Sequence, residues 1–221
     1  MKIITPLLII VILFIALCFE ASAEKSKWKK LKETNGVQMF SRSIKNSKFK
    51  EYKAISYIDL PMEFLFEALL DINNYPKWYP DCLEAKILKS FDTDHVEGNF
   101  IVYFFLDAQW PASNRDVVVR SESMHDWENG HVVIKLKKNN YRYPIKKGVQ
   151  RMAEFQAEYD FQYITRSKTR VIYKSYADIG GRVPAGLANA TNNKLTVKTI
   201  IKLRERAKAP EYKKKAMNDY F

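Results

Sequence analysis

The clearest pattern of hydrophobic and polar positions lies between residues 152 and 163. Every second position is apolar or aromatic: Ala153, Phe155, Ala157, Tyr159, Phe161 and Tyr163. The positions between them are polar: Glu154, Gln156, Glu158, Asp160 and Gln162. A period of two predicts a strand of an antiparallel sheet with one buried and one solvent-facing side. Similar runs predict further strands over residues 83–91, 99–106, 115–122, 132–137 and 169–177. These strands follow one another without intervening helices, which argues against a parallel α/β fold.

A shorter and looser pattern precedes these strands. Residues 28–60 alternate in polarity, and the Asn35-Gly36 pair within them is typical of a hairpin turn. Pro61 then begins a short helix, because the missing N–H of proline is not needed in a first helical turn. Apolar residues recur at helical spacing on one face of this helix: Phe64, Leu65, Ala68, Leu69 and Ile72. We expect this helix to end within residues 73–76.

A long helix is predicted near the end of the chain. It begins at Pro184, just after Gly180-Gly181, and we expect it to run to about Lys208, before Pro210. Apolar residues on one face of it are Val183, Leu187, Ala190, Val197 and Ile201, and Lys194 interrupts that face. The order of the elements predicts an α+β fold, in which a curved antiparallel sheet wraps around the long C-terminal helix with a ligand cavity between them.

The first residues predict export. A basic start, Met1-Lys2, precedes an apolar run over residues 3–19, and Ala21-Ser22-Ala23 supplies the small residues that a signal peptidase requires. The most apolar part, residues 7–19, is shorter than the roughly 20 residues of a membrane span. We therefore expect a signal peptide, residues 1–23, cleaved near Ala23, and a single domain over residues 24–221. The expected location is the periplasm or the outside of the cell, and an uncleaved anchor is the alternative.

The net charge of the chain limits the classes of partner that we expect it to bind. Thirty-seven Lys and Arg against 25 Asp and Glu give a net charge of +12, and a hydrophobic fraction of 47% is typical of a globular protein. A basic chain can bind nucleic acid, an anionic membrane or acidic ligands. Export removes nucleic acid from the expected partners. Half of the excess charge lies in residues 194–221, so this segment either makes transient contact with an anionic membrane or is a plain solvated helix face.

Metal and cofactor chemistry have no sequence support. Cys18 leaves with the signal peptide, so Cys82 has no internal disulfide partner, and we expect it to be buried and inert. The histidines His95, His125 and His131 do not stand at metal-ligand spacing. No nucleotide-binding glycine motif and no nucleophile elbow is present. We therefore expect no metal, no cofactor and no catalytic residue, and a monomer.

Three local motifs carry a resemblance to a known family. They are Tyr-Pro-Lys-Trp-Tyr-Pro-Asp at 75–81, Trp-Pro-Ala-Ser-Asn-Arg-Asp at 110–116 before a valine-rich strand, and Asp-Ile-Gly-Gly-Arg-Val-Pro-Ala at 178–185. In this order they resemble the START (StAR-related lipid-transfer) family, although Ile179 stands where that family usually has proline. The resemblance covers about residues 28–208. It implies a helix-grip fold with a hydrophobic tunnel under the last helix that holds one lipid or sterol. The wider superfamily includes polyketide cyclases, so a cyclase- or hydrolase-like enzyme is the alternative.

Seven residues are candidates for ligand binding: Tyr103, Phe105, Trp110, Arg120, Tyr159, Tyr176 and Lys194. Tyrosine suits a lipid tunnel because it combines apolar area with one hydroxyl. The resemblance implies a buried arginine on the strand of Arg120, and an inward Arg120 would need an anionic or hydroxyl partner; a surface Arg120 stays open. Lys194 either reaches solvent at the rim or binds an anionic head group. Both faces of residues 102–106 are apolar, so either face could line the cavity.

Overall fold

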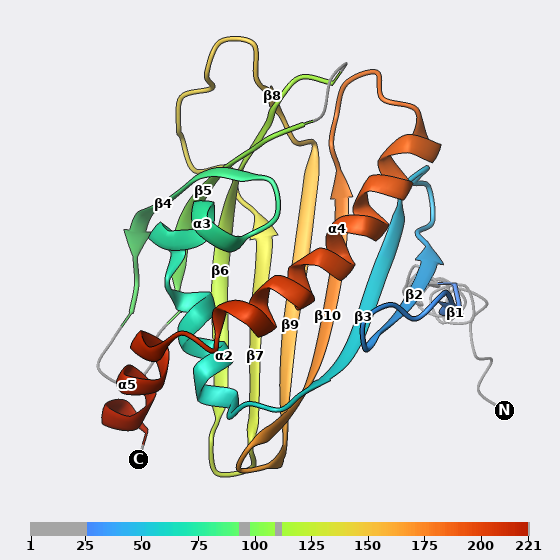
Figure 1. Cartoon of the computed structure of the whole chain (residues 1–221). Coiled ribbons are helices and arrows are strands. Elements are labelled where there is room, and N and C mark those ends of the chain that lie inside the picture. The colour runs from blue at the N-terminus through green and yellow to red at the C-terminus, as the bar shows by residue number, and fades with distance from the viewer. Residues whose placement is uncertain (1–25, 93–97, 109–111, 221) are drawn as a thin grey trace, which may run out of the picture.

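Ten strands form one sheet in the computed structural model, which describes residues 26–92, 98–108 and 112–220 (Figure 1). The strands are β1 (Lys29–Lys30), β2 (Val37–Ser43), β3 (Lys50–Ile58), β4 (Cys82–Ser90), β5 (Phe100–Leu106), β6 (Arg115–Asp126), β7 (His131–Lys138), β8 (Gln150–Arg151), β9 (Glu154–Thr165) and β10 (Lys168–Asp178). The helices are α2 (Met62–Leu70), a 3₁₀ turn (Ile72–Asn74), α3 (Tyr75–Trp78), α4 (Ala185–Arg206) and α5 (Pro210–Asp219).

The sheet is almost entirely antiparallel. Its strand order is β1-β2-β3-β10-β9-β7-β6-β5-β4, and only the short β8 pairs in parallel, with β6. The predicted strands and the hairpin at Asn35-Gly36 are confirmed. Both turn residues have left-handed backbone angles, with φ of 52° and 74°, which the first hairpin turn between β1 and β2 requires.

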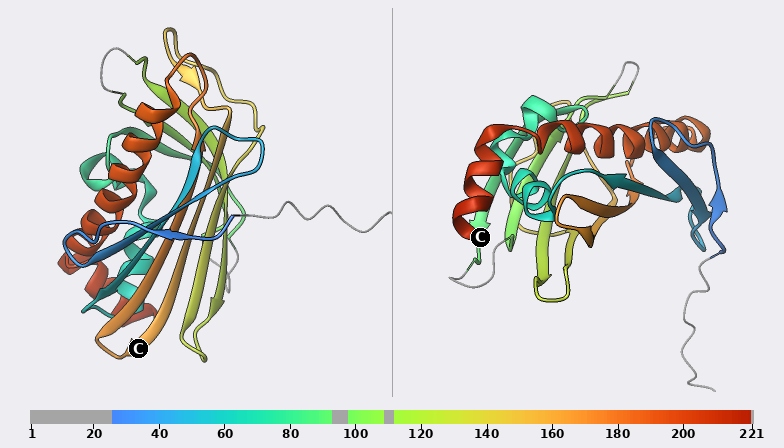
Figure 2. Two further views of the ribbon diagram at one scale, coloured as in Figure 1. Left: turned by 90° about the vertical axis from the view of Figure 1, so that its right-hand side faces the viewer. Right: turned by 60° about the horizontal axis from the view of Figure 1, so that its bottom comes forward.

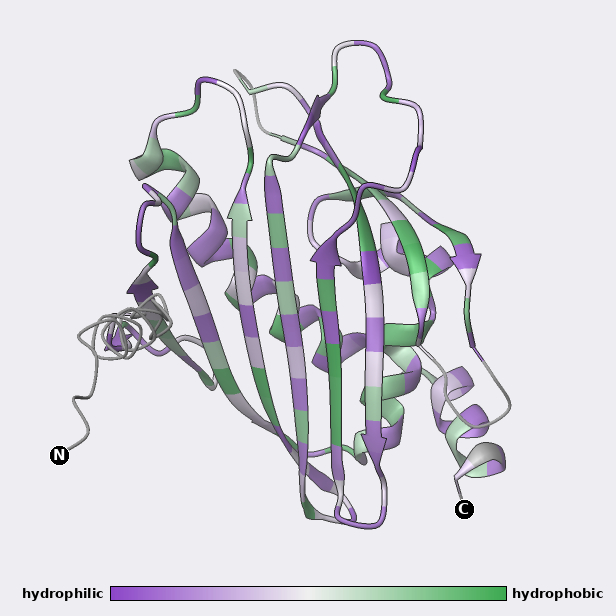
Figure 3. Ribbon diagram, turned by 180° about the vertical axis from the view of Figure 1, so that it is seen from behind, coloured by the Kyte–Doolittle hydropathy of each residue, from purple (hydrophilic) through white to green (hydrophobic). Residues whose placement is uncertain are grey.

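The sheet has an inner face, which carries the helices, and an outer face (Figure 2). Helix α4 crosses the inner face diagonally, and α2 and α5 lie near its C-terminal end (Figure 1). The outer face is seen from behind in Figure 3, where hydrophobic and hydrophilic residues alternate along the strands. Inward side chains such as Phe161 and Val171 form the main core together with Leu65, Phe66 and Leu203. The curved sheet and long C-terminal helix confirm the predicted α+β fold.

The buried face of α4 differs from the predicted one. Its buried residues are Ala188, Thr196, Thr199, Ile200 and Leu203. Of the predicted face, Val183 precedes the helix, Leu187 and Ala190 are exposed, and Val197 and Ile201 are only partly buried. Short side chains on the buried stripe let the helix approach the sheet, and two of them are threonines. Their hydroxyls bond to helix carbonyls of Asn192 and Leu195 at 2.7 and 2.9 Å. Because those hydroxyls are satisfied locally, polar residues occupy a stripe that hydropathy assigns to solvent.

Residues after α4 form a further helix, α5, which the sequence pattern did not predict. Pro210 occupies the first turn of α5, which packs beside α2. Lys215 Nζ lies 2.6 Å from the carboxylate of Glu67, a buried residue of α2, and the Tyr220 hydroxyl donates to the same carboxylate at 2.9 Å. The Tyr212 hydroxyl donates to Asp71 at 2.6 Å. None of the helices described, which start after residue 60, is long and apolar enough to span a membrane.

Asp116 ties together the segment that opens β6. Its side chain is completely buried and accepts two hydrogen bonds from Arg151, at 3.0 and 2.7 Å. The same guanidinium donates to the carbonyl of Tyr143, so it also anchors the loop before β8. The motif at 110–116 therefore fixes the fold through Asp116, at least over its described part.

We predict that Asp116→Asn lowers the free energy of unfolding by about 3 kcal/mol, because it removes the buried charge partner of Arg151. Urea unfolding followed by circular dichroism measures this change. Glu158→Gln is the matched control, since its pair with Lys174 at 2.6 Å lies on the partly exposed outer face and is worth about 1 kcal/mol or less. Equal losses in the two variants would contradict the role of Asp116.

Candidate functional site

A cavity of about 260 Å³ lies between α4 and the inner face of the sheet. Its walls come from α4, from β10, from the turn that follows α3 and from the residues just after β5. Apolar side chains such as Phe155, Ile179 and Leu195 make up much of the lining. The N-terminal two-thirds of α4 spans this space, while its last turns pack directly on the core through Ile200 and Leu203.

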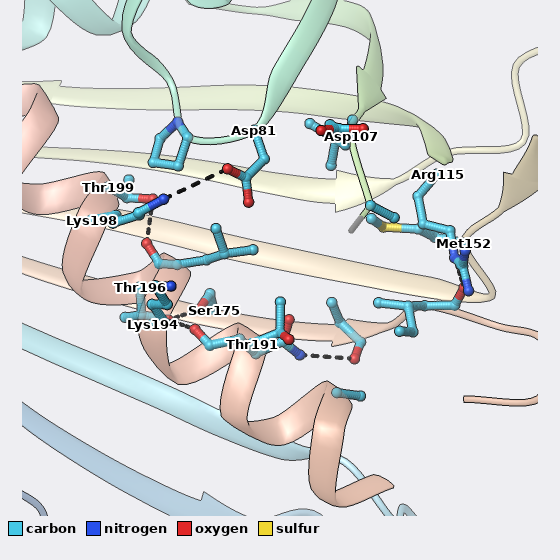
Figure 4. Close-up of a pocket in the computed structure, with 18 of the residues that line it drawn as sticks. Asp81, Asp107, Arg115, Met152, Ser175, Thr191, Lys194, Thr196, Lys198 and Thr199 are labelled. Atoms are coloured by element: carbon cyan, nitrogen blue, oxygen red, sulfur yellow. Dashed lines mark hydrogen bonds and ion pairs between the residues drawn. The ribbon is translucent and has the colours of Figure 1, made fainter. Parts of the chain in front are cut away.

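The rim of the cavity carries charges (Figure 4). Lys198 on α4 reaches across to Asp81 after α3, with 3.7 Å between its amine and the carboxylate. Lys194 lies one helical turn earlier on the same helix and also lines the cavity, as does Asp107 on the opposite wall. Asp81 adopts a left-handed backbone with φ of 56°, which places it at the tip of its turn. An amphiphile whose tail lies inside would meet cations and carboxylates at this rim.

Arg115 lies at the other end of the cavity, near Met152 (Figure 4). It is buried, its Nε donates to the carbonyl of Ile179 at 3.0 Å, and an Nη donates to the carbonyl of Ser113. Burial lowers the pKa of the Arg115 guanidinium from its usual value. No carboxylate in the described parts of the chain forms an ion pair with it. Arg115 thus joins the start of β6 to the segment before α4 and presents a positive charge to the cavity.

Three tyrosines lie where the cavity borders the core. The rings of Tyr159 and Tyr173 stack with centroids 4.5 Å apart, and Tyr79 lies against them from the turn after α3. Burial raises the pKa of all three phenols above the usual value, so they stay neutral. The Tyr159 hydroxyl is shielded from solvent. It interacts electrostatically with Tyr79, yet within the described parts of the chain no hydrogen bond of ordinary geometry reaches it.

A second, smaller cavity of about 30 Å³ lies beyond these tyrosines. Its walls include Tyr75, Phe104, Leu136 and Tyr159, all of which lie in the main core or stack within it. It is therefore a packing defect of the core next to the larger cavity.

The seven predicted binding residues divide into three groups. Lys194 lines the large cavity and Tyr159 the small one. Trp110 lies outside the described residues. Tyr103, Phe105, Arg120 and Tyr176 belong to strand positions that face the outer side of the sheet, so the structure does not bring them to either cavity.

Each of these four residues has its own contacts on the outer face. Tyr103 is buried against Tyr143, with ring centroids 4.4 Å apart, beneath the loop before β8. The amine of Lys146 lies 4.4 Å from the ring centroid of Phe105. The guanidinium of Arg120 lies 4.0 Å from the ring centroid of Phe91, with its Nε 3.4 Å from Glu122. The hydroxyl of Tyr176 lies 3.0 Å from that of Ser47.

Strand alternation explains this division. On β5 the cavities take the side chains of Phe104 and Leu106, so Tyr103 and Phe105 point the other way. On β6 Arg120 shares its side with Val118, which belongs to the outer cluster around Tyr103. The outer face carries a small apolar cluster of its own, which is why both faces of residues 102–106 are apolar.

Sequence reasoning missed the functional potential of Tyr79 and Arg115. Both lie inside motifs that carried the family resemblance, at 75–81 and 110–116, and that was the available signal. The two-residue alternation that predicts strand faces gives no information on Tyr79, because Tyr79 lies in a turn. The place of Arg115 in the cavity wall depends on the tertiary structure, because the end of β10 and the start of α4 come from a distant part of the chain.

Among the described residues, Cys82, His125 and His131 show no reactive arrangement. Cys82 is buried, and burial raises its pKa to about 12, so the thiol stays protonated at neutral pH. His131 pairs with Asp160 at 3.0 Å on the outer face, and the ring of His125 packs on Phe66 with centroids 4.7 Å apart. His95 lies outside the described residues. Within the described parts of the chain, no group of three or more metal-ligating side chains comes together.

Comparison with known proteins agrees with this architecture. The family model for the START domain matches residues 16–212. An uncharacterized protein of Pseudomonas aeruginosa is 29% identical over 163 residues, which cover 74% of this chain and 78% of that protein. The phosphatidylcholine transfer protein of Rattus norvegicus is 25% identical over 182 residues, which cover 77% of this chain and 82% of that protein.

Solved structures share the fold. The crystal structure of a STAR-related lipid transfer protein fragment from Xanthomonas axonopodis superimposes with a TM-score of 0.73 at 23% identity, covering 83% of this chain and all of that fragment. The crystal structure of human STARD10 superimposes with a TM-score of 0.74 at 20% identity, covering 94% of this chain and 82% of that one.

Proposed function

Because this chain belongs to the START domain family, we propose that it is a lipid-binding and lipid-transfer protein that holds one hydrophobic ligand in the cavity beneath α4. The observation that carries this proposal is the cavity itself, which has an apolar interior and a charged rim. A site of this kind accepts the tail of an amphiphile inside and its polar group at the rim. Similarity to proteins named for phosphatidylcholine and lipid transfer supports the same class of ligand.

The proposed mechanism is passive. The protein docks on a membrane, the segment around Gly180 and Gly181 moves together with the start of α4, and one lipid enters the cavity. Both glycines have left-handed backbone angles, with φ of 64° and 69°, so this segment tolerates side chains poorly. Each methylene that leaves water contributes about 0.8 kcal/mol to uptake. Lys194 at the rim and Arg115 at the other end of the cavity are the cations without an ion pair, among the described residues, that are available to the polar part of the ligand.

We further propose that the protein acts outside the cytoplasm. Support comes from the basic start, the apolar run and the small residues of Ala21-Ser22-Ala23, which lie outside the described residues. In the periplasm or outside the cell, a protein that shields a hydrocarbon chain from water carries lipid across an aqueous space.

The C-terminal helices are the proposed membrane-facing part. Among the described side chains, five of the nine Lys and Arg in residues 194–215 form ion pairs within the chain. The other four have no ion pair and are exposed: Lys194, Lys202, Lys213 and Lys214. These lysines are available to anionic lipid, at about 1 kcal/mol for each one near the membrane surface.

We predict that Ala177→Phe abolishes most lipid binding. Ala177 lines the cavity from β10, so a phenyl ring there occupies space that the ligand needs. Excluding two methylenes costs about 1.6 kcal/mol, or more than tenfold in affinity. Extraction of a fluorescent phospholipid from vesicles measures this loss.

Tyr176→Phe is the matched control for that experiment, because Tyr176 is the adjacent residue and bonds to Ser47 on the outer face. We expect it to bind lipid like the wild type. A folded Ala177→Phe protein with wild-type extraction would contradict the proposed site. A loss confined to Tyr176→Phe would instead place the ligand on the outer face.

For membrane docking, we predict that replacing both Lys213 and Lys214 with Gln weakens cosedimentation with phosphatidylglycerol-containing vesicles by about thirtyfold, which corresponds to about 2 kcal/mol. The control replaces Lys135 and Lys137 on the outer face of β7 with Gln, which removes the same charge. An equal loss in both double variants would show a general charge effect and contradict docking through α5.

A further inference from the structure

The two cavities beside the sheet share one wall. Three residues line both of them: Tyr79, Leu106 and Phe155. The large cavity opens toward the charged rim, whereas the small one is lined by core residues alone. The shared wall therefore separates the two cavities, and the small cavity is space just beyond it, on the side of the core.

Of the three residues of this wall, Tyr79 alone carries a polar group, and its backbone, ring and hydroxyl each contact neighbouring residues. Its backbone N–H donates to the carbonyl of Tyr75 at 2.7 Å, which ends α3. Its ring stacks on that of Tyr75, with centroids 5.1 Å apart and planes 7° apart, and lies 6.3 Å from that of Phe104. Its hydroxyl lies among the side chains of Tyr159, Tyr173 and Thr199. A ring fixed in this way does not yield easily to an incoming hydrocarbon chain.

We propose that Tyr79 sets the length of the hydrocarbon chain that the protein accepts, because its ring closes the large cavity against the small one. This inference rests on the proposed lipid-binding function. A tail that grows from the rim inward gains affinity with each methylene until it reaches the ring of Tyr79. Beyond that point a further methylene has to displace the ring or stay outside the cavity, so the gain ends. Without the ring, the small cavity and the space of the ring itself join the site.

The test uses straight-chain saturated fatty acids that differ by one methylene, each titrated by displacement of a fluorescent fatty acid. For the wild type, affinity rises by about fourfold per methylene and then reaches a plateau at one chain length. In Tyr79→Ala the rise continues to longer chains before the plateau. Tyr79→Phe keeps the ring and therefore keeps the wild-type plateau.

Leu136→Ala is the matched control for enlarged space. Leu136 lines only the small cavity, so its truncation enlarges that cavity and leaves the shared wall in place. We expect its plateau to stay at the wild-type chain length. Leu106→Ala provides a second opening of the shared wall, with less effect on packing than the loss of an aromatic ring. If thermal melting shows that Tyr79→Ala does not fold, the chain-length series is measured with Leu106→Ala instead.

Several results would overturn the role of Tyr79. One is binding by Tyr79→Ala or Leu106→Ala with the plateau unchanged. Another is an equal shift in Leu136→Ala, which would mean that the tail already passes the wall. A shift in Tyr79→Phe would assign the limit to the hydroxyl instead of the ring. Failure of the wild type to bind any member of the series would contradict the lipid-binding function and the length limit together.

Discussion

The long helix α4 has to keep water from most of the inner face of a ten-stranded sheet, with α2 and α5 covering the rest near its C-terminal end. The cavity follows from that constraint. At its C-terminal end α4 meets the core through Ile200 and Leu203, which are fully buried. Towards its N-terminal end the stripe that faces the sheet consists of short side chains such as Ala188 and Thr196. These allow a close approach but cannot fill the volume that the curved sheet encloses. The cavity is therefore a product of the same small residues that position the helix.

Ion pairs to buried carboxylates hold α5 and the loop before β8 in place. Glu67 is buried in α2 and forms an ion pair with Lys215, which holds α5 against α2. Asp116 performs a similar task for Arg151 and the loop before β8. In both cases a basic side chain is paired with a buried carboxylate, so these two basic residues are structural. The lysines without ion pairs are the part that is left for a partner.

The fold could be predicted from the sequence more fully than the site. Period-two alternation placed the strands because one face of a sheet is dry, and Phe155 and Phe161 follow that rule. It could not choose between two faces that are both apolar, as with Tyr103 and Phe104, since a loop covers the outer one. Of the candidates Arg120 and Tyr176, neither lines either of the two cavities, and the surface position that the sequence left open for Arg120 is the one observed. Tyr79 was missed because it lies in a turn. Helix α5 was missed because its sequence is mostly basic and polar, so the ion pair of Lys215 with the buried Glu67 could not be predicted. The apolar pattern did not include the threonines of the buried α4 stripe, since their bonds to helix carbonyls cannot be seen in a hydropathy pattern.

The central claim is that the cavity beneath α4 holds one lipid molecule. Native mass spectrometry of the full chain, expressed in a bacterium and recovered without detergent, measures this most directly. The account predicts a population heavier than the polypeptide by the mass of a single lipid, which organic extraction removes and identifies. A chain found only at its polypeptide mass, both as isolated and after incubation with vesicles of the host's lipids, would contradict it.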